Sequence, residues 1–524
     1  MKKIRTQNKF YITFTGLILV NVVLIFATRL LPFIDLPQHL AYATIHKYIG
    51  QAGNYFDQYF KVFPLFMKWN SFHPFFCGLE IWPSVEFGNR IFFSLYVILL
   101  PASVLYFIKK INGNLWLALL SFVLIYNFNV SWGFVGFIFA IPICIFTMAK
   151  NLDLLHKTRL QDQIYLTLLL LFIYHLHILS LFIITLTLFV QNIVYNKTNF
   201  KKIIRTSWPY LVGVFLLLYF IIVFTNQYNQ VRTAERTYNN MVSSHMGVNI
   251  FETLKNIPRR LPFLIFKNHS YLFAGKKGVG IGLFFFSVIV SPIVISVVNI
   301  KKYPEAFDKK LLVIVGTIFF YLLIYLFYPG QILDWQRYSI FILLLLIVLG
   351  SRLFKFEYLS VKIIFVIISI IYFSIIVDYF SEYNKVNKNF TESLFKGVPK
   401  NKVLSGLMIR NKFRGKQYMF GFFPDYHIVW NKGIESLRLA NGYPYYQLYR
   451  KVSENVLPDY HEHVGLQKTY YGRFNNVDFL LLRGELDDFI YPVSKKLIRE
   501  NFKLYRKRGI WQLFKSKKII NNKD

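Results

Sequence analysis

The hydrophobic positions of this chain fall in long, uninterrupted runs separated by polar connections. A run of about 20 apolar residues is long enough, at about 1.5 Å per residue, to cross a hydrocarbon core of about 30 Å as a helix. About eleven runs approach this length, so the pattern predicts a mostly α, polytopic bundle of membrane helices. We expect the spans near residues 10–32, 90–108, 114–130, 133–149, 163–178, 179–196, 207–225, 278–299, 310–328, 338–353 and 361–380.

The pattern changes after residue 383. Apolar runs shorten to about four or five residues bounded by charged turns, which is typical of strands, and a helical stretch lies near 492–501. A segment of about 140 residues can bury a core of its own. We therefore expect a transmembrane domain over 1–383, with outer loops at 33–89 and 226–277, and a small soluble α/β domain over 384–524.

Composition supports the assignment to membranes. Hydrophobic residues make up 55% of the 524 positions and charged residues only 17%, whereas a soluble domain carries about 25% charged residues. The formal net charge of +35 could indicate nucleic acid. However, the charges lie in short loops and in the tail, which favours anionic membrane lipids and argues against nucleic acid as a partner.

The distribution of Lys and Arg predicts the orientation in the membrane. If the N-terminus is cytoplasmic, every connection placed on the cytoplasmic side carries Lys or Arg, as the positive-inside rule requires. An odd number of spans then puts the C-terminus outside. The loops 33–89 and 226–277 and the domain 384–524 share this outer face, so we expect the chemistry there.

The short segment that directly follows the first span is the main candidate for chemistry, Ile34-Asp35-Leu36-Pro37-Gln38-His39-Leu40. A carboxylate beside lipid is costly to keep, which makes Asp35 a candidate functional residue. The alternative is that Asp35 only caps a helix that begins around Pro37. His39 lies four residues on, so on a helix it shares a face with Asp35, either as part of a site or as interfacial packing.

This segment and the outer C-terminal domain resemble the bacterial integral-membrane glycosyltransferases of the GT-C fold. The run Asp35-Leu-Pro-Gln-His-Leu-Ala-Tyr-Ala43 carries the resemblance in residues, and the topology carries it over the rest of the chain. The resemblance implies an enzyme of the cell envelope in the cytoplasmic (inner) membrane, with a polyprenyl phosphate sugar as donor and Asp35 as the catalytic carboxylate. The acceptor, whether glycan, lipid or protein, stays open.

Sugar transfer from a lipid phosphate to an alcohol needs a base, cations for the leaving phosphate and a groove for the prenyl chain. Asp35 is the expected base, and His39 its neighbour. The candidate cations for the phosphate are Arg337, at the outer start of the tenth span, and three residues of the outer loop 226–277, namely Arg259, Arg260 and Lys276. Snorkelling, ion pairing or contact with lipid headgroups are the alternatives for these residues.

Weaker candidates for contacts with the sugar or the acceptor are Asn127, Trp132 and His73, all in outer segments. Trp132 fits an interfacial aromatic belt equally well. The sequence establishes no cofactor. Dependence on a divalent cation stays open, although no cluster of carboxylates supports it, and we assign no metal ligand.

Three other functions compete with the enzyme. A lipid or polysaccharide transporter would carry charges near the bilayer midplane and a repeat relating its halves, and neither is evident. A non-catalytic membrane protein of envelope assembly would keep the fold without the reaction. A polysaccharide ligase would also work on the outer face.

Overall fold

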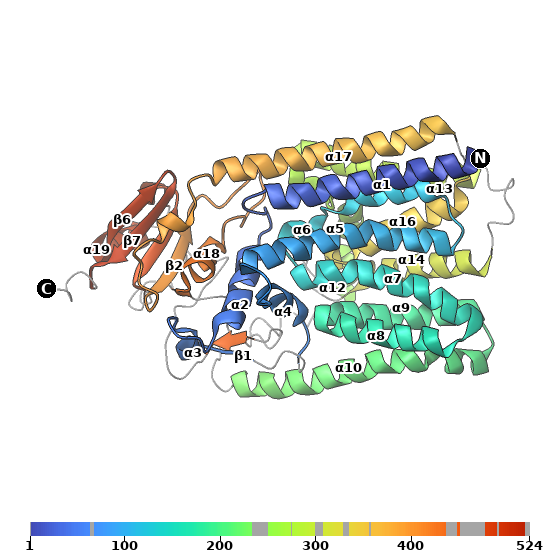
Figure 1. Ribbon diagram of the computed structural model, residues 1–524, viewed down its shortest axis with the longest axis horizontal. Coiled ribbons are helices and arrows are strands. Elements are labelled where there is room, and N and C mark those ends of the chain that lie inside the picture. The colour runs from blue at the N-terminus through green and yellow to red at the C-terminus, as the bar shows by residue number, and fades with distance from the viewer. Residues whose placement is uncertain are drawn as a thin grey trace. The chain divides into compact units, whose positions relative to one another are not determined.

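The computed structural model describes residues 2–62, 68–232, 250–273, 275–298, 308–328, 335–355, 358–435, 448–450, 477–489 and 492–518. Most of these residues are helical, and the strands lie mainly in the C-terminal part of the chain (Figure 1). Much of the expected outer loop 226–277 and parts of the tail therefore lie outside the described residues.

Within the described residues, nine helical segments of at least 18 residues are apolar enough to cross a membrane, which indicates a multi-pass membrane protein. They lie in α1 (Lys2–Ala27), α5 (Val85–Lys110), η2 (Leu115–Leu124) with α6 (Phe128–Trp132), α7 (Val135–Lys157), α9 (Ile178–Asn196), α10 (Phe200–Arg232), α13 (Gly275–Val298), α14 (Lys309–Phe327) and α17 (Leu359–Val386). Helices also form at the expected fifth and tenth spans, α8 (Leu160–Leu176) and α16 (Ser339–Leu353), but they are shorter. The count of about eleven spans stays a prediction.

Buried polar side chains join several of these helices. The Asn151 amide on α7 donates to Gln191 Oε1 on α9 at 3.0 Å, and the Tyr210 hydroxyl on α10 donates to Asn151 Oδ1 at 2.7 Å. Because lipid offers no hydrogen-bond partners, such polar groups are satisfied between helices and help to fix their packing.

The chain divides into two compact units. The first comprises Met1–Ala27 and Phe93–Tyr379, and the second comprises Thr28–Phe92 and Phe380–Asp524. The segment after the first helix is therefore grouped with the C-terminal residues and not with the helices that follow it. Strand β1 (Phe60–Val62) of this segment pairs antiparallel with β4 (Leu448–Arg450) of the C-terminal residues.

A five-stranded mixed sheet forms the C-terminal part of the second unit. Its order is β3 (Ile434–Glu435), β2 (Val403–Met408), β5 (Phe479–Arg483), β7 (Trp511–Ser516) and β6 (Phe502–Arg508). Strand β2 is parallel to β3 and β5, whereas β7 is antiparallel to β5 and β6. The helix α19 (Pro492–Asn501) contributes Ile498 to a core that includes Leu480, Leu482 and Phe514.

Short elements complete the description. They are α2 (Leu36–Tyr48), α3 (Phe56–Tyr59), α4 (Phe72–Gly78), α12 (Ile250–Phe266), η4 (Ser270–Leu272), η7 (Glu392–Leu394), η8 (Phe423–Asp425), α18 (Tyr426–Asn431) and η12 (Leu486–Asp488). In the second unit, α2 packs against α4, α18 and η8, so the segment that follows Asp35 is at the centre of this unit.

Candidate functional site

Asp35 stands at the N-cap position of helix α2, and Pro37 lies in the first turn. The Asp35 backbone has helical angles, and its carboxylate makes no capping hydrogen bond to the described backbone. A capping aspartate would accept from the second or third amide of the helix. The residue is partly exposed, so its carboxylate is placed to interact with groups other than its own helix.

The segment before Asp35 is fastened to the end of α17. Leu30 and Asn384 exchange two hydrogen bonds: the Leu30 amide donates to Asn384 Oδ1 at 2.9 Å, and Asn384 Nδ2 donates to the Leu30 carbonyl at 3.0 Å. Arg29 donates to the carbonyls of Asn387 and Phe390 at 2.5 and 2.6 Å. These contacts fix the path of the chain into α2.

One helical turn after Asp35, His39 faces a second histidine. The rings of His39 on α2 and His73 on α4 lie edge to face, with centroids 5.8 Å apart. His73 Nε2 is 3.0 Å from Oδ1 of Asn89, near the start of α5, while its Nδ1 has no described partner. Because an amide oxygen only accepts hydrogen bonds, Nε2 is the ring nitrogen of His73 that carries the proton.

Both imidazoles are neutral at neutral pH. Burial lowers the pKa of His39 to about 3, with a smaller contribution from His73. Burial also lowers the pKa of His73 to about 4, although the bond to Asn89 opposes this shift. Neutral imidazoles bind hydroxyl groups by hydrogen bonding but carry no charge to stabilise a phosphate.

The charge of Asp35 also influences Lys416, a residue distant in the sequence. Burial lowers the pKa of Lys416 well below its usual value, and the charge of Asp35 acts in the opposite direction. Lys416 belongs to the loop between β2 and η8, and its amide and carbonyl exchange hydrogen bonds with Phe413 across a tight turn. Asp35 and Lys416 thus belong to the same unit although they lie far apart in the sequence.

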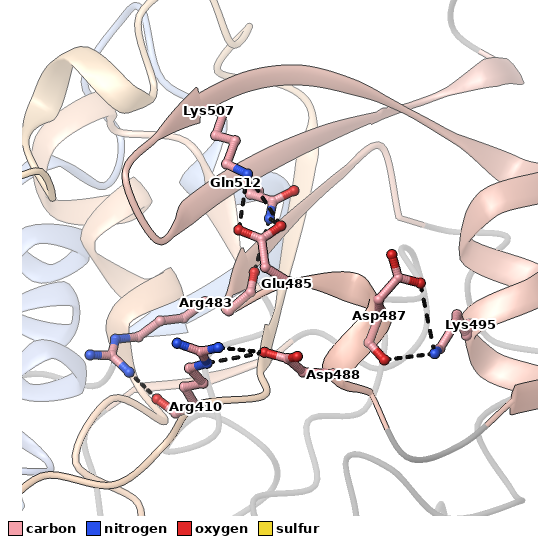
Figure 2. Close-up of polar contacts among 9 residues, drawn as sticks. Arg410, Arg483, Glu485, Asp487, Asp488, Lys495, Lys507 and Gln512 are labelled. Carbon is pink, nitrogen blue, oxygen red and sulfur yellow. Dashed lines mark hydrogen bonds and ion pairs between the residues drawn. The ribbon is translucent and has the colours of Figure 1, made fainter.

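The loop that carries Lys416 is braced against the sheet, as Figure 2 shows for its first residues. The guanidinium of Arg410 bonds Asp488 through two nitrogens at 2.8 and 3.1 Å. Arg483 on β5 donates to the Arg410 carbonyl, and its guanidinium lies 3.6 Å from the ring centroid of Phe420. Beside this contact, Lys507 and Gln512 both donate hydrogen bonds to the Glu485 carboxylate. The two ends of the loop are therefore tied to β5 and its turn.

A second buried cluster lies in the same unit beside α2. Asp425, His427 and Glu435 are each at most 2% exposed. Burial raises the pKa of Asp425 well above its usual value, and Glu435 raises it further by its charge and a hydrogen bond. Both effects favour the protonated form of Asp425. Burial also lowers the pKa of His427 to about 3.

In the first unit, Arg337 lies on an aromatic surface. Its guanidinium carbon is 3.9 Å from the ring centroid of Phe134, which stacks on Trp132 at 6.1 Å. The Asn129 amide donates to the Arg337 carbonyl at 3.3 Å. Arg337 and Trp132 are thus neighbours, whereas Asn127 is fully buried and caps α6 by accepting from the Asn129 amide.

The other expected phosphate ligands differ in their surroundings. Nη1 of Arg260 donates to three carbonyls at the end of α14, those of Tyr325, Leu326 and Tyr328, at 2.9–3.1 Å. The Arg260 side chain therefore caps the last carbonyls of helix α14. Arg259 and Lys276 are exposed and remain candidates for an anion.

The structure therefore groups Asp35, His39 and His73 in one unit and Arg337, Trp132, Asn127 and Arg260 in the other. Whether Arg337 and Asp35 act on one substrate stays a prediction. Lys416 was not predicted from the sequence, because a lysine in an Arg-Gly-Lys turn resembles any solvated loop. Lys68 was also missed: it is 2% exposed, and burial lowers its pKa to about 7.

Among the described residues, no group of three His, Cys, Asp or Glu side chains is placed to hold a metal ion. Comparison of the chain with protein-family models and with curated proteins gives no match.

Proposed function

We propose that this protein is a membrane glycosyltransferase that moves a sugar from a polyprenyl phosphate donor to an acceptor hydroxyl. The observation that carries the proposal is the state of Asp35: it stands at the start of a buried helix, is partly exposed and makes no capping bond to the described backbone. A carboxylate used only as a cap would accept an amide hydrogen bond. The placement supports a role as general base.

In the proposed reaction Asp35 removes the proton of the acceptor hydroxyl as its oxygen bonds to the anomeric carbon. The bond between that carbon and the phosphate oxygen breaks, and the polyprenyl phosphate leaves with the electron pair. A positioned base contributes about 10²- to 10⁴-fold to such a rate. His39 and His73, both neutral, are suited to hold hydroxyl groups of the sugar or acceptor.

The leaving phosphate needs a cation. Arg337 is the candidate, with Trp132 beside it as a surface on which a sugar ring can pack. Arg259 and Lys276 are exposed alternatives. We further propose that the protein lies in the bacterial cytoplasmic membrane with its N-terminus inside and the second unit outside, as the loop charges favour.

The test uses membranes that contain the full-length protein and a panel of polyprenyl phosphate hexoses and pentoses labelled in the sugar. Asp35→Asn should reduce label transfer at least about 100-fold, with unchanged protein in the membrane. Asp57→Asn is the matched control, because Asp57 is an exposed carboxylate in the same loop. Transfer by Asp35→Asn at the wild-type rate would remove Asp35 from the mechanism.

A further inference from the structure

Helix α12 (Ile250–Phe266) is fixed to the end of a candidate membrane helix. Nη1 of Arg260 donates to carbonyls at the end of α14 at 2.9–3.1 Å, and the Tyr325 hydroxyl donates back to the Arg260 carbonyl at 2.7 Å. Helix α14 is apolar enough to cross a membrane, so its last turn lies near the boundary between the acyl chains and the lipid headgroups. The part of α12 around Arg260 therefore lies at this boundary.

Aromatic side chains at the same level agree with this depth. The Trp335 ring packs edge to face against Tyr325 and Phe263, with centroids 5.1 and 5.2 Å apart. The Arg260 guanidinium lies 4.9 Å from the Trp335 ring centroid. Trp and Tyr are enriched where a membrane protein passes from acyl chains to water, so this cluster marks the boundary on the helix ends that it joins.

The outward face of α12 is apolar and cationic at once. Leu254 and Leu261 are each 44% exposed, and with the exposed Pro258 they form a stripe at positions i, i+4 and i+7. The exposed Lys255 and Arg259, four residues apart, lie beside this stripe. The other face of the helix packs against α13 and α14. An exposed apolar stripe next to cations is typical of a helix in the headgroup region, with its apolar side chains toward the acyl chains.

Helix α13 (Gly275–Val298) extends this surface. It packs closely against the end of α12, because a side chain at Gly282 would clash with the Phe266 carbonyl. Lys276 and Lys277 lie more than one turn before that contact, and both are exposed. The start of α13 therefore adds its two lysines to the region beside the end of α12.

The cations of this region have no carboxylates near them in the sequence. From residue 253 to residue 304 the sequence contains no Asp or Glu. In the proposed orientation these cations lie on the outer side, where the positive-inside rule expects few of them. Their unbalanced charge at headgroup depth favours an anionic partner there. The cationic surface consists of five exposed residues, Lys255, Arg259, Lys267, Lys276 and Lys277.

We propose that the cationic surface binds the phosphate groups of anionic phospholipids in the surrounding bilayer, while Leu254 and Leu261 enter the acyl-chain region. Lipid phosphates lie at the depth that the end of α14 gives to α12, and acyl chains cover the apolar stripe. A soluble anion would neutralise the cations but leave the leucines in water. Arg259 and Lys276 then meet phosphates of the bilayer and not the leaving phosphate of the proposed reaction.

The first experiment tests whether α12 contacts lipid. Full-length protein in which Cys77 and Cys144 are replaced by Ala carries a nitroxide label on Leu261→Cys, in bilayers of phosphatidylcholine and phosphatidylglycerol. The label should collide more often with oxygen, which concentrates among acyl chains, than with a water-soluble nickel chelate. A label on Lys157→Cys, at an exposed position at the end of α7, should show the reverse. A Leu261→Cys label as accessible to the chelate as this control would overturn the proposal.

The second experiment tests whether the surface selects anionic lipid. Full-length protein in phosphatidylcholine bilayers is cross-linked to a phosphatidylglycerol with a photoactivatable acyl chain, and the yield within residues 254–277 is read by mass spectrometry. Unlabelled phosphatidylglycerol should compete better than phosphatidylcholine. Lys255→Gln with Arg259→Gln should lower the yield about tenfold, with unchanged protein in the bilayer. Lys157→Gln with Lys201→Gln removes two other exposed lysines and should leave the yield unchanged.

The competition also separates bilayer lipid from the sugar donor. Equal competition by phosphatidylglycerol and phosphatidylcholine, or an unchanged yield in the Lys255 and Arg259 variant, would overturn the proposal. Competition by polyprenyl phosphate but not by phosphatidylglycerol would also overturn it, and would return Arg259 to the leaving phosphate. Each of these results is independent of the transfer assay with Asp35→Asn, so the two proposals can fail separately.

Discussion

Burial controls the charge of individual residues in the second unit. His39, His73 and His427 are all buried, and their lowered pKa values keep them neutral at neutral pH. The same desolvation raises the pKa of Asp425 and so favours its protonated form. Asp35 differs from these groups because it is partly exposed, so that water and an acceptor hydroxyl can reach its carboxylate.

Because His73 is buried in its neutral form, we expect it to lower the free energy of unfolding as the pH falls. Its pKa is about 4 in the folded protein and about 6.5 in an unfolded chain. Its contribution is therefore complete above pH 6.5 and is lost as the pH falls toward 4, by about 2 kcal/mol at pH 5. We expect His73→Gln to flatten the loss of thermal stability between pH 7 and pH 5, measured on purified protein.

The control for this prediction is His156→Gln, which removes an exposed histidine and should leave the pH dependence unchanged. A His73→Gln protein that loses stability between pH 7 and pH 5 as steeply as the wild type would contradict the prediction.

For Asp425 we expect the opposite dependence of stability on pH. Its pKa in the folded protein is raised, so its contribution to stability is complete below the unfolded pKa and declines as the pH rises through the folded value. Asp425→Asn keeps a hydrogen-bond donor toward Glu435 and removes the ionisation of this side chain. We expect this variant to gain thermal stability relative to the wild type as the pH rises from acid to alkaline values, while Asp57→Asn should not.

At the scale of single residues, the sequence could predict Asp35 but not Lys416. Asp35 directly follows a run of apolar residues, and that position alone marks it. Lys416 is one of 61 Lys and Arg residues, and only the folding of its turn into the same unit as Asp35 distinguishes it. His73 was named as a candidate, but its partner Asn89 has no local signal.

At the scale of elements, helix α12 places two adjacent arginines in different environments. Its neighbouring residues Arg259 and Arg260 point to different environments, because Arg259 is exposed and Arg260 is 3% exposed. Arg260 also lies 4.9 Å from the Trp335 ring centroid. Sequence alone treated the two arginines as equivalent, since spacing does not tell which face of a short helix meets another helix.

Replacing Arg260 should damage the fold, whereas replacing Arg259 should not. Arg260→Met leaves the last carbonyls of α14 without their charged donor, and hydrogen bonds to charged groups are worth about 1.5–3 kcal/mol each. We expect Arg260→Met to lower the thermal unfolding temperature and the amount of folded protein in detergent. Arg259→Met should unfold like the wild type, so any loss of sugar transfer in it would indicate contact with an anion.

The turn that carries Lys416 depends on glycine. Gly415 has a φ of 77°, and a side chain in this region costs about 1–2 kcal/mol. Gly415→Ala should therefore loosen the turn and bring the rate at which an amine-reactive ester acylates Lys416, read by mass spectrometry, toward that of exposed lysines. Gly16→Ala, on a helix with open space at that position, should have no such effect, and equal rates of Lys416 acylation in both variants would contradict the prediction.

At the scale of the whole molecule, periodicity was sufficient to predict a multi-pass membrane protein with a small sheet-containing region at its C-terminus. The pattern places helices well because lipid requires every backbone group in a span to be satisfied locally. It could not predict that Thr28–Phe92 joins the C-terminal residues in one unit. That grouping depends on contacts such as Arg29 with Phe390, which leave no trace in local spacing.

The proposed topology can be measured with single cysteines. Both native cysteines, Cys77 and Cys144, are buried, so they can be replaced by Ala without removing a reactive thiol. In that background, Lys503→Cys on the exposed edge strand β6 should react with a membrane-impermeant maleimide in intact cells, and Lys157→Cys at the end of α7 should react only after lysis. The reverse labelling pattern would show that the protein has the opposite orientation in the membrane.

The two hydrogen bonds between Leu30 and Asn384 join residues 354 positions apart, and this has a consequence for biosynthesis. When the first helix and Asp35 leave the ribosome, the residues that hold them in place have not yet been made. At about 5–20 residues per second, the segment must wait tens of seconds for its partners. The nascent chain therefore contains Asp35 before the residues that hold its segment have been made. A protein truncated before α17 would insert its helices into the membrane without ever forming these contacts.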